Sequence, residues 1–215
     1  MEVYELLLQR YGALHWWPAD TPFEVCVGAI LTQNTNWLNV EKAIANLKRE
    51  GLVSVEALWE IDRERLAELI RPSGFFNVKS ARLKNFLRWL LEGHGSLDAM
   101  FSGDWQLLRD ELIAVRGIGR ETCDSILLYA GSKPSFVVDA YTGRLFSRLG
   151  LADGTESYQQ LRSLFMEALP ADRALFNEYH ALIVEQCKRH CRKKPLCCGC
   201  PLRSLCAFSL ASLGE

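Results

Sequence analysis

Two glycines and a lone acid could do chemistry within residues 112–139 of this 215-residue chain. Gly117 and Gly119 lie one residue apart between two helical stretches, and glycine adopts backbone conformations that other residues avoid. Such a turn leaves amide N–H groups bare at the start of the next helix, where a phosphate can bind. A short apolar run then ends at the carboxylate of Asp139. This combination indicates an enzyme that holds DNA and acts on it.

A crowded group of cysteines is the strongest local pattern. Six of the eight cysteines fall between Cys187 and Cys206. We expect a cytoplasmic protein, because residues 1–12 lack the basic region and cleavage site of an export signal and no apolar run reaches the roughly 18 residues of a membrane span. In a reducing compartment such thiols bind a metal or a cluster more often than they pair as disulfides. The spacing alone leaves zinc and an iron–sulfur cluster open.

The net charge and the local distribution of charge give different indications about nucleic-acid binding. A net charge of −1 is low for a protein that binds nucleic acid. Basic side chains nevertheless gather locally, and the distribution of charge matters more than its sum. Such runs also occur on ordinary solvated helix faces. The two groups are Lys79, Arg82, Lys84 and Arg88, and then Arg116, Arg120 and the basic residues of 188–194.

Helical periodicity must position these groups. Thr21 predicts an N-cap with Pro22 in the first helical turn, and Ser54 predicts a second cap. No alternating pattern predicts a strand, apart from a run at 136–138 that is too short to build a sheet. The chain is therefore predicted to be all-α. Helices are expected at about 22–31, 38–47, 80–91, 140–149, 155–168 and 172–190.

The hairpin, the single acid and the cysteines together resemble the helix-hairpin-helix DNA glycosylases of the endonuclease III superfamily over about residues 22–206. The resemblance implies two helical domains with a DNA-binding groove between them. A six-helix barrel at about 22–134 would carry the hairpin, and residues 1–21 plus 135–215 would form the second domain. It also implies a monomer without membrane attachment, whose partner is double-stranded DNA containing a damaged base.

The same resemblance implies a 4Fe–4S cluster in a loop at 187–206. The implied ligands are Cys191, Cys197, Cys200 and Cys206. The last two gaps fit the family pattern, whereas the first gap has five residues where six is usual. Cys187 and Cys198 are spare thiols that could substitute.

The front half is similar to one branch, the type III 3-methyladenine DNA glycosylases. Trp16-Trp17-Pro18, the stretch from Ala29 to Thr35 and Trp37 carry this similarity. That branch typically lacks the cluster. The resemblance implies that Trp16, Trp17, Pro18 and Trp37 form the base pocket, where flat rings suit a positively charged alkylated purine. Packing in the core or between domains is the alternative role of these tryptophans.

The resemblance further implies roles at the DNA. Asp139 would be the catalytic carboxylate, which stabilises positive charge on the sugar or activates water, and could also cap the helix at 140–149. Gln33 and Asn34 would enter the duplex, with hydrogen bonding inside their loop as the alternative. Phosphates would be held by Lys79, Arg82, Arg116, Gly117, Gly119 and Arg120, with help from a monovalent cation, Na⁺ or K⁺.

Glu121 narrows the predicted reaction. Bifunctional members carry a lysine two positions after the second hairpin glycine, and its amine forms a Schiff base that leads to strand cleavage. Here Glu121 has that position and would itself belong to the base pocket, and Lys133 does not match the motif. We therefore predict a monofunctional glycosylase for a damaged, alkylated base. The alternatives are a glycosylase/lyase for oxidised pyrimidines, a mispair glycosylase, and a non-catalytic DNA-binding module that senses redox state.

Overall fold

The computed structural model describes residues 1–211, and this part of the chain is helical with no strand. The predicted all-α fold is therefore confirmed. The chain divides into two compact units. Residues 17–133 form one, called here the hairpin unit, and residues 1–16 with the chain from Pro134 onward form the other, called the cysteine unit. The sequence had led us to place these divisions at 22 and 135.

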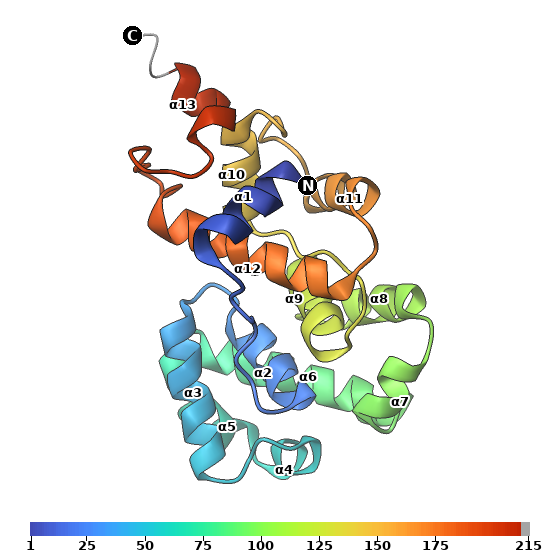
Figure 1. Ribbon diagram of the computed structural model, residues 1–215. Coiled ribbons are helices and arrows are strands. Elements are labelled where there is room, and N and C mark those ends of the chain that lie inside the picture. Colours follow the sequence, from blue (N-terminus) through green and yellow to red (C-terminus); the bar gives the residue numbers. More distant parts are fainter. Residues whose placement is uncertain (212–215) are drawn as a thin grey trace. The chain divides into compact units, whose positions relative to one another are not determined.

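The hairpin unit is built around helix α2, Pro22–Leu31. Every residue from Phe23 to Leu31 is buried, as expected for a helix that is apolar on all sides. Helices α3 and α6 pack against it (Figure 1). In chain order the other elements are α3 Trp37–Arg49, α4 Val55–Glu60, α5 Arg63–Leu69, a 3-10 turn at Arg71–Ser73, α6 Phe76–Gly93, α7 Leu97–Ser102, α8 Trp105–Ala114, and α9 Arg120–Ser125, which continues as a π-helical turn at Ile126–Ala130.

Polar side chains cap several of these helices as predicted. The Thr21 hydroxyl accepts the backbone N–H of Glu24 at 3.1 Å, with Pro22 in the first turn, and Ser54 caps α4 in the same way. Helix α6 differs, because it begins at Phe76 rather than near Ser80. A turn with positive φ at Gly74 and Phe75 sets its start, and the Ser80 hydroxyl donates to the Asn77 carbonyl inside the helix.

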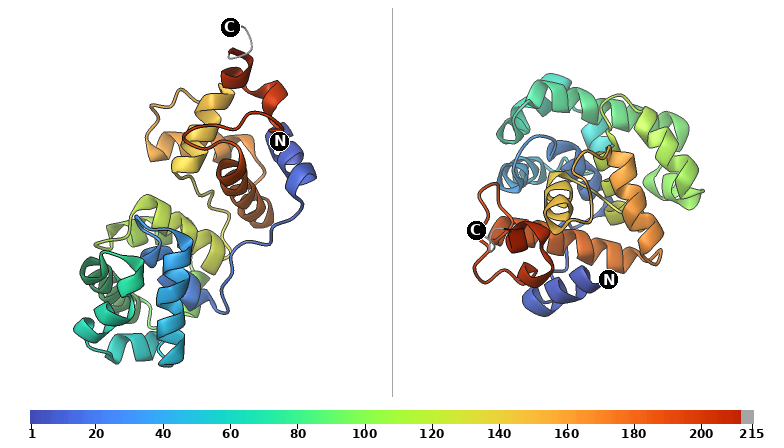
Figure 2. Two further views of the ribbon diagram at one scale, coloured as in Figure 1. Left: turned by 90° about the vertical axis from the view of Figure 1, so that its left-hand side faces the viewer. Right: turned by 90° about the horizontal axis from the view of Figure 1, so that it is seen from above.

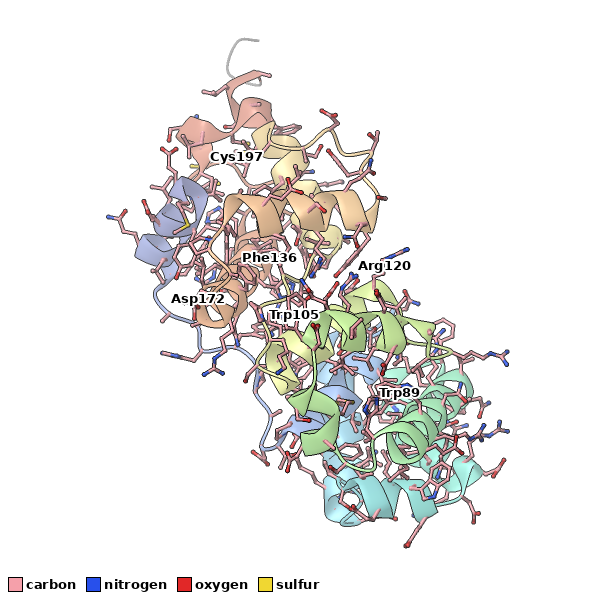
Figure 3. The ribbon with its side chains drawn as sticks, turned by 90° about the vertical axis from the view of Figure 1, so that its right-hand side faces the viewer. Trp89, Trp105, Arg120, Phe136, Asp172 and Cys197 are labelled. Atoms are coloured by element: carbon pink, nitrogen blue, oxygen red, sulfur yellow. The ribbon has the colours of Figure 1, made fainter. Side chains whose placement is uncertain are left out.

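The cysteine unit is built around its longest helix, α12, Arg173–Arg189. Helices α1, Glu2–Tyr11, and α10, Ala140–Leu149, both pack on α12 (Figures 1 and 2). Phe136, which is labelled in Figure 3, is fully buried in this unit. Its ring stacks on Phe165 with centroids 4.1 Å apart. The run at 136–138 is thus extended core chain, not a strand. The remaining elements are α11 Tyr158–Ala168, a 3-10 turn at Arg203–Leu205, and α13 Ala207–Ala211.

None of the helices among residues 1–211 combines the length and apolar character that crossing a membrane would require.

Candidate active site and nucleic-acid interface

Asp139 is the N-cap of α10, as predicted. Its Oδ1 accepts the backbone N–H of Thr142 at 2.8 Å and the Thr142 hydroxyl at 3.0 Å. The Asp139 backbone N–H donates to the same hydroxyl, which completes a capping box. These contacts hold one carboxylate oxygen in a fixed direction at the positive end of the helix.

His180 of α12 faces the other oxygen of this carboxylate. Its Nε2 lies 3.6 Å from Asp139 Oδ2, and the two side chains are 8% and 14% exposed. Burial by itself raises the pKa of Asp139, but His180 and the Thr142 hydrogen bonds outweigh it and hold the pKa below its ordinary value of 3.8. Asp139 is therefore ionised at neutral pH. The sequence offered one weak sign of His180, a polar residue directly before the apolar run Ala181–Val184.

The hairpin lies between α8 and α9. Gly117 has φ 102°, and a Cβ on it would lie 2.3 Å from Arg82 Cγ, so glycine is required both for conformation and for room. The Arg116 carbonyl accepts from the Asn85 side chain at 3.0 Å. Arg109 of α8 and the buried Asp124 of α9 form a bidentate ion pair at 2.7 and 3.0 Å. The turn is thus fixed from both sides.

The first turn of α9 begins at this hairpin. Gly119 is its N-cap and has no side chain to bond the first amides, which leaves them for an anion. Arg116, Arg120 and Glu121 are exposed beside them.

Gln33 does not extend from the protein surface. Its Nε2 donates to the Gly117 carbonyl at 3.0 Å and to the Thr122 hydroxyl at 2.9 Å, and its Oε1 accepts from the Arg82 guanidinium. These partners lie outside the loop of Gln33, so the hydrogen bonds are neither contacts with DNA nor bonds inside that loop. Asn34 is exposed and has φ 55°, a left-handed conformation that asparagine tolerates.

Lys79 is buried, which argues against the phosphate contact predicted for it. The side chain is 1% exposed, and its Nζ donates to the carbonyls of Leu31 at 2.8 Å and Ser73 at 2.6 Å. Burial lowers the pKa of Lys79 to about 8. Helical position explains the error: Lys79 falls on the inner face of α6 with Leu83 and Phe86, so it cannot project into solvent.

These bonds join three segments of the hairpin unit, which we call the loop face: residues 31–36, 73–76 and 116–119. Lys79 links the first two, and Gln33 links the first and third. Phe75 lies on the second, 67% exposed and with φ 45°. An exposed aromatic ring held in a left-handed backbone is costly, and such strain occurs mainly at functional sites. The sequence did not distinguish Phe75 from its partly buried neighbour Phe76.

The predicted pocket tryptophans are distributed over both units. In the hairpin unit, the Trp17 ring lies edge-on to Trp37 and tilted against Tyr129, each with centroids 4.9 Å apart. Gly28 adjoins this cluster, because a Cβ there would meet Trp17 and Trp37 at 3.5 Å. Trp16 belongs to the cysteine unit. Lys188 Nζ lies 5.3 Å from its ring centre, while Pro18 is exposed.

The cysteine unit contains a pocket lined by the four predicted ligands, Cys191, Cys197, Cys200 and Cys206. Figure 3 shows Cys197 next to the C-terminal segments of the chain. The two spare thiols are not part of the lining. Cys187 is buried and its Sγ lies 3.5 Å from the Tyr141 carbonyl, while Cys198 is exposed. This difference favours Cys191 over both alternatives.

Polar groups reach the sulfur atoms of this pocket. Gln186 Nε2 lies 3.1 Å from Cys200 Sγ, and Arg148 Nη1 lies 3.3 Å from Cys191 Sγ. A hydrogen bond from Cys187 lowers the pKa of Cys191 to about 6, with help from Arg148 and against the effect of burial. Among residues 1–211 no three Cys, His, Asp or Glu side chains converge closely enough to form a metal centre. The donor type, number and shared pocket nevertheless fit a sulfur-ligated group.

Comparison with known proteins decides the family. Residues 27–171 match the model of the HhH-GPD superfamily base excision DNA repair proteins. The chain belongs to this family. A Methanocaldococcus jannaschii protein, MJ1434, named as a candidate DNA repair glycosylase, is 50% identical over 95% of this chain and 94% of its own. Endonuclease III of Thermotoga maritima is 30% identical over 96% of this chain and 92% of its own.

Solved structures agree with this assignment. The 3-methyladenine DNA glycosylase MagIII of H. pylori, bound to 1,N6-ethenoadenine, has a TM-score of 0.77 and 29% identity over 87% of this chain and 96% of its own. An endonuclease III–DNA complex has a TM-score of 0.84 over 100% of this chain and 96% of its own, with 21% identity, and so supports the HhH-GPD fold alone. The predicted resemblance to endonuclease III and to 3-methyladenine glycosylases is confirmed, and the HhH-GPD chain is a DNA repair glycosylase.

Proposed function

We propose that this HhH-GPD protein is a monofunctional glycosylase that removes an alkylated base from double-stranded DNA and leaves an abasic site. The proposal is carried by two separate observations. Asp139 is an ionised carboxylate whose side chain is only 14% exposed, and Glu121 has the position of the lysine of strand-cleaving members.

Asp139 is suited to the hydrolytic step. Breaking the bond between base and sugar builds positive charge on the sugar, which a preorganised carboxylate stabilises while water attacks. Thr142 fixes the direction of Oδ1, and the depressed pKa keeps the group negative at neutral pH. The carboxylate thus needs no change of protonation state before it acts.

Glu121 cannot supply the amine that a lyase needs. It is exposed in the first turn of α9, and its carboxylate forms no imine. The buried amine of Lys79 is committed to two carbonyl groups. The similarity to endonuclease III keeps a glycosylase/lyase as the second candidate, so strand cleavage must be tested directly.

The loop face is the proposed DNA interface of the hairpin unit. Exposed Arg116 and Arg120, with the amides at Gly117 and Gly119, would hold phosphates, and Na⁺ or K⁺ could share this task. Asn34 and Phe75 are the exposed side chains suited to enter a duplex, Phe75 as an apolar wedge between base steps. The hydrogen bonds of Gln33 and Arg82 would hold the loops of this face in place. The groove between domains stays a prediction.

An alkylated base is supported by the aromatic groups and by similarity. Trp17, Trp37 and Tyr129 form a cluster of rings, and a flat ring attracts a cationic base. The H. pylori 3-methyladenine glycosylase, which resembles the chain at 29% identity, was solved with an ethenoadenine bound.

We further propose a 4Fe–4S cluster held by Cys191, Cys197, Cys200 and Cys206. When bound, the cluster would order the segment around it, which has too few buried apolar residues to fold alone. Gln186 and Arg148 would donate hydrogen bonds to the ligand sulfur atoms.

A panel of duplexes tests the function. The purified protein is incubated with duplexes that carry an alkylated, deaminated, oxidised or mispaired base, and free base and strand breaks are measured separately. We expect free base from the alkylated duplex, breaks only after alkali, and no release by Asp139→Asn. A covalent adduct trapped by borohydride would overturn the monofunctional assignment. DNA binding without base release from any duplex would favour a non-catalytic binding module instead.

A further inference from the structure

We infer that His180 is a positioning residue that holds the Asp139 carboxylate in its reactive orientation. This inference rests on the catalytic role proposed for Asp139. The capping box does not reach the second oxygen of the carboxylate. We assign the contact at that oxygen to a side chain from a different helix.

The two carboxylate oxygens have separate partners. Oδ1 is bonded by the backbone N–H and hydroxyl of Thr142, both on α10, whereas Oδ2 faces His180 Nε2 of α12. Contacts to Oδ1 alone allow the carboxylate plane to turn about the axis through that oxygen. A second contact at Oδ2 from another element stops this rotation. His180 therefore supplies a constraint that the capping box cannot.

Core packing fixes the distance between the two elements. Phe136, just before Asp139, packs edge-on against Phe176 and Tyr179, the latter next to His180, with centroids 5.2 and 5.9 Å apart. Phe136 and Phe176 are fully buried. Beyond the pair, Cys187 of α12 contacts the Tyr141 carbonyl of α10. His180 thus lies between two contacts that join α12 to residues 136–141, and its ring cannot move away from Asp139 without disturbing the core.

His180 also compensates a buried negative charge. Placing an ionised carboxylate in the interior is costly unless polar groups face it. An imidazole can direct an N–H at the carboxylate in both its neutral and its protonated form, so the long flexible side chain of a lysine or arginine is not needed.

The variants His180→Leu and His180→Gln test the inference, measured on the duplex that wild type cleaves best. Single-turnover base release gives the chemical step, and anisotropy with an abasic-analogue duplex gives affinity. We expect His180→Leu to slow release by about 10- to 100-fold, because the second oxygen of the charged carboxylate loses the polar group that faces it. Affinity should change less than twofold, and His180→Gln should recover part of the rate because its amide can still donate.

A matched control is His94→Leu, which breaks a second histidine–carboxylate pair, His94 with Glu111 at 3.2 Å on the hairpin unit. Its rate should equal that of wild type. If His180→Leu fails to fold, two other measurements test the inference. One is the rate of His180→Gln, and the other is the NMR signals of the His180 ring, which Asp139→Asn should shift.

Two outcomes overturn the inference: a His180→Leu rate within twofold of wild type, or unshifted His180 ring signals in Asp139→Asn. Failure of wild type to release base from any duplex would instead refute the proposed function, so the two failures are distinct.

Discussion

The variant Lys79→Met distinguishes between two roles for Lys79, a buried structural contact and a contact with a DNA phosphate. The ammonium donates to two buried carbonyls, those of Leu31 and Ser73, and methionine has a similar length without a donor. A buried carbonyl that loses its donor costs about 1–3 kcal/mol, so the two together cost about 2–6 kcal/mol. Removing the ammonium also removes the cost of burying its charge, which offsets part of this loss. We expect a net fall of about 2–3 kcal/mol in the free energy of unfolding.

Urea unfolding measures this loss, and the salt dependence of DNA binding measures the alternative role. A lysine that neutralises one phosphate contributes about 0.9 to the slope of log affinity against log salt. We expect Lys79→Met to leave that slope unchanged. Arg120→Gln, at the exposed start of α9, should lower it by about 0.9 with little effect on stability.

Lys84→Met is the matched control for stability. Lys84 lies on the same helix and donates to the carbonyls of Leu58, Trp59 and Ile61, but it is only partly buried, so water can replace it there. Its loss should cost less than that of Lys79. The reasoning would be refuted if Lys79→Met unfolded at the same urea concentration as wild type, or if it lowered the salt slope.

The remaining predictions concern the DNA interface, the carboxylate and the cysteine pocket. Gly117→Ala should weaken duplex binding at least tenfold, because a Cβ at φ 102° is strained by about 1–3 kcal/mol and meets a neighbouring side chain; unchanged anisotropy would contradict this. Phe75→Ala should slow base release by about tenfold or more but leave thermal unfolding unchanged, since the ring is mostly exposed. Because the pKa of Asp139 lies below its ordinary value, the carboxylate is charged above pH 3.8 and loses its charge only below that pH. Single-turnover rates should therefore be flat between pH 5 and 7, and a midpoint near pH 6 would exclude the assignment. Cys197→Ser should abolish bound iron and sulfide, whereas Cys198→Ser, outside the pocket, should retain both.

Local rules predicted much of the fold. Helix starts at Thr21, Ser54 and Asp139 followed from short-range capping chemistry, and all three caps are present. The hairpin followed from the two glycines for a similar reason, since only the local backbone decides that turn. The start of α6 was missed because a left-handed Phe75, which no propensity favours, sets it.

The site was harder to predict because its contacts join distant segments. His180 approaches Asp139 only through the packing of α12 on α10, and no local pattern encodes that pairing. Lys79 was misassigned because its charge was given more weight than its place on the apolar side of α6. Gln33 has the chemistry for DNA, yet its partners Gly117 and Thr122 lie far along the chain.

The order of the chain also bears on how the molecule is made. The hairpin unit is one continuous stretch, so it can fold on the ribosome as soon as residue 133 has emerged. Helix α1 is synthesised before the hairpin unit and its partner α12 after it, so the bonds from Tyr11 to Gln186 and from Leu14 to Glu178 must wait for α12. During synthesis the amphipathic α1 therefore remains without its partner. The cysteine segment follows α12 and therefore emerges after it.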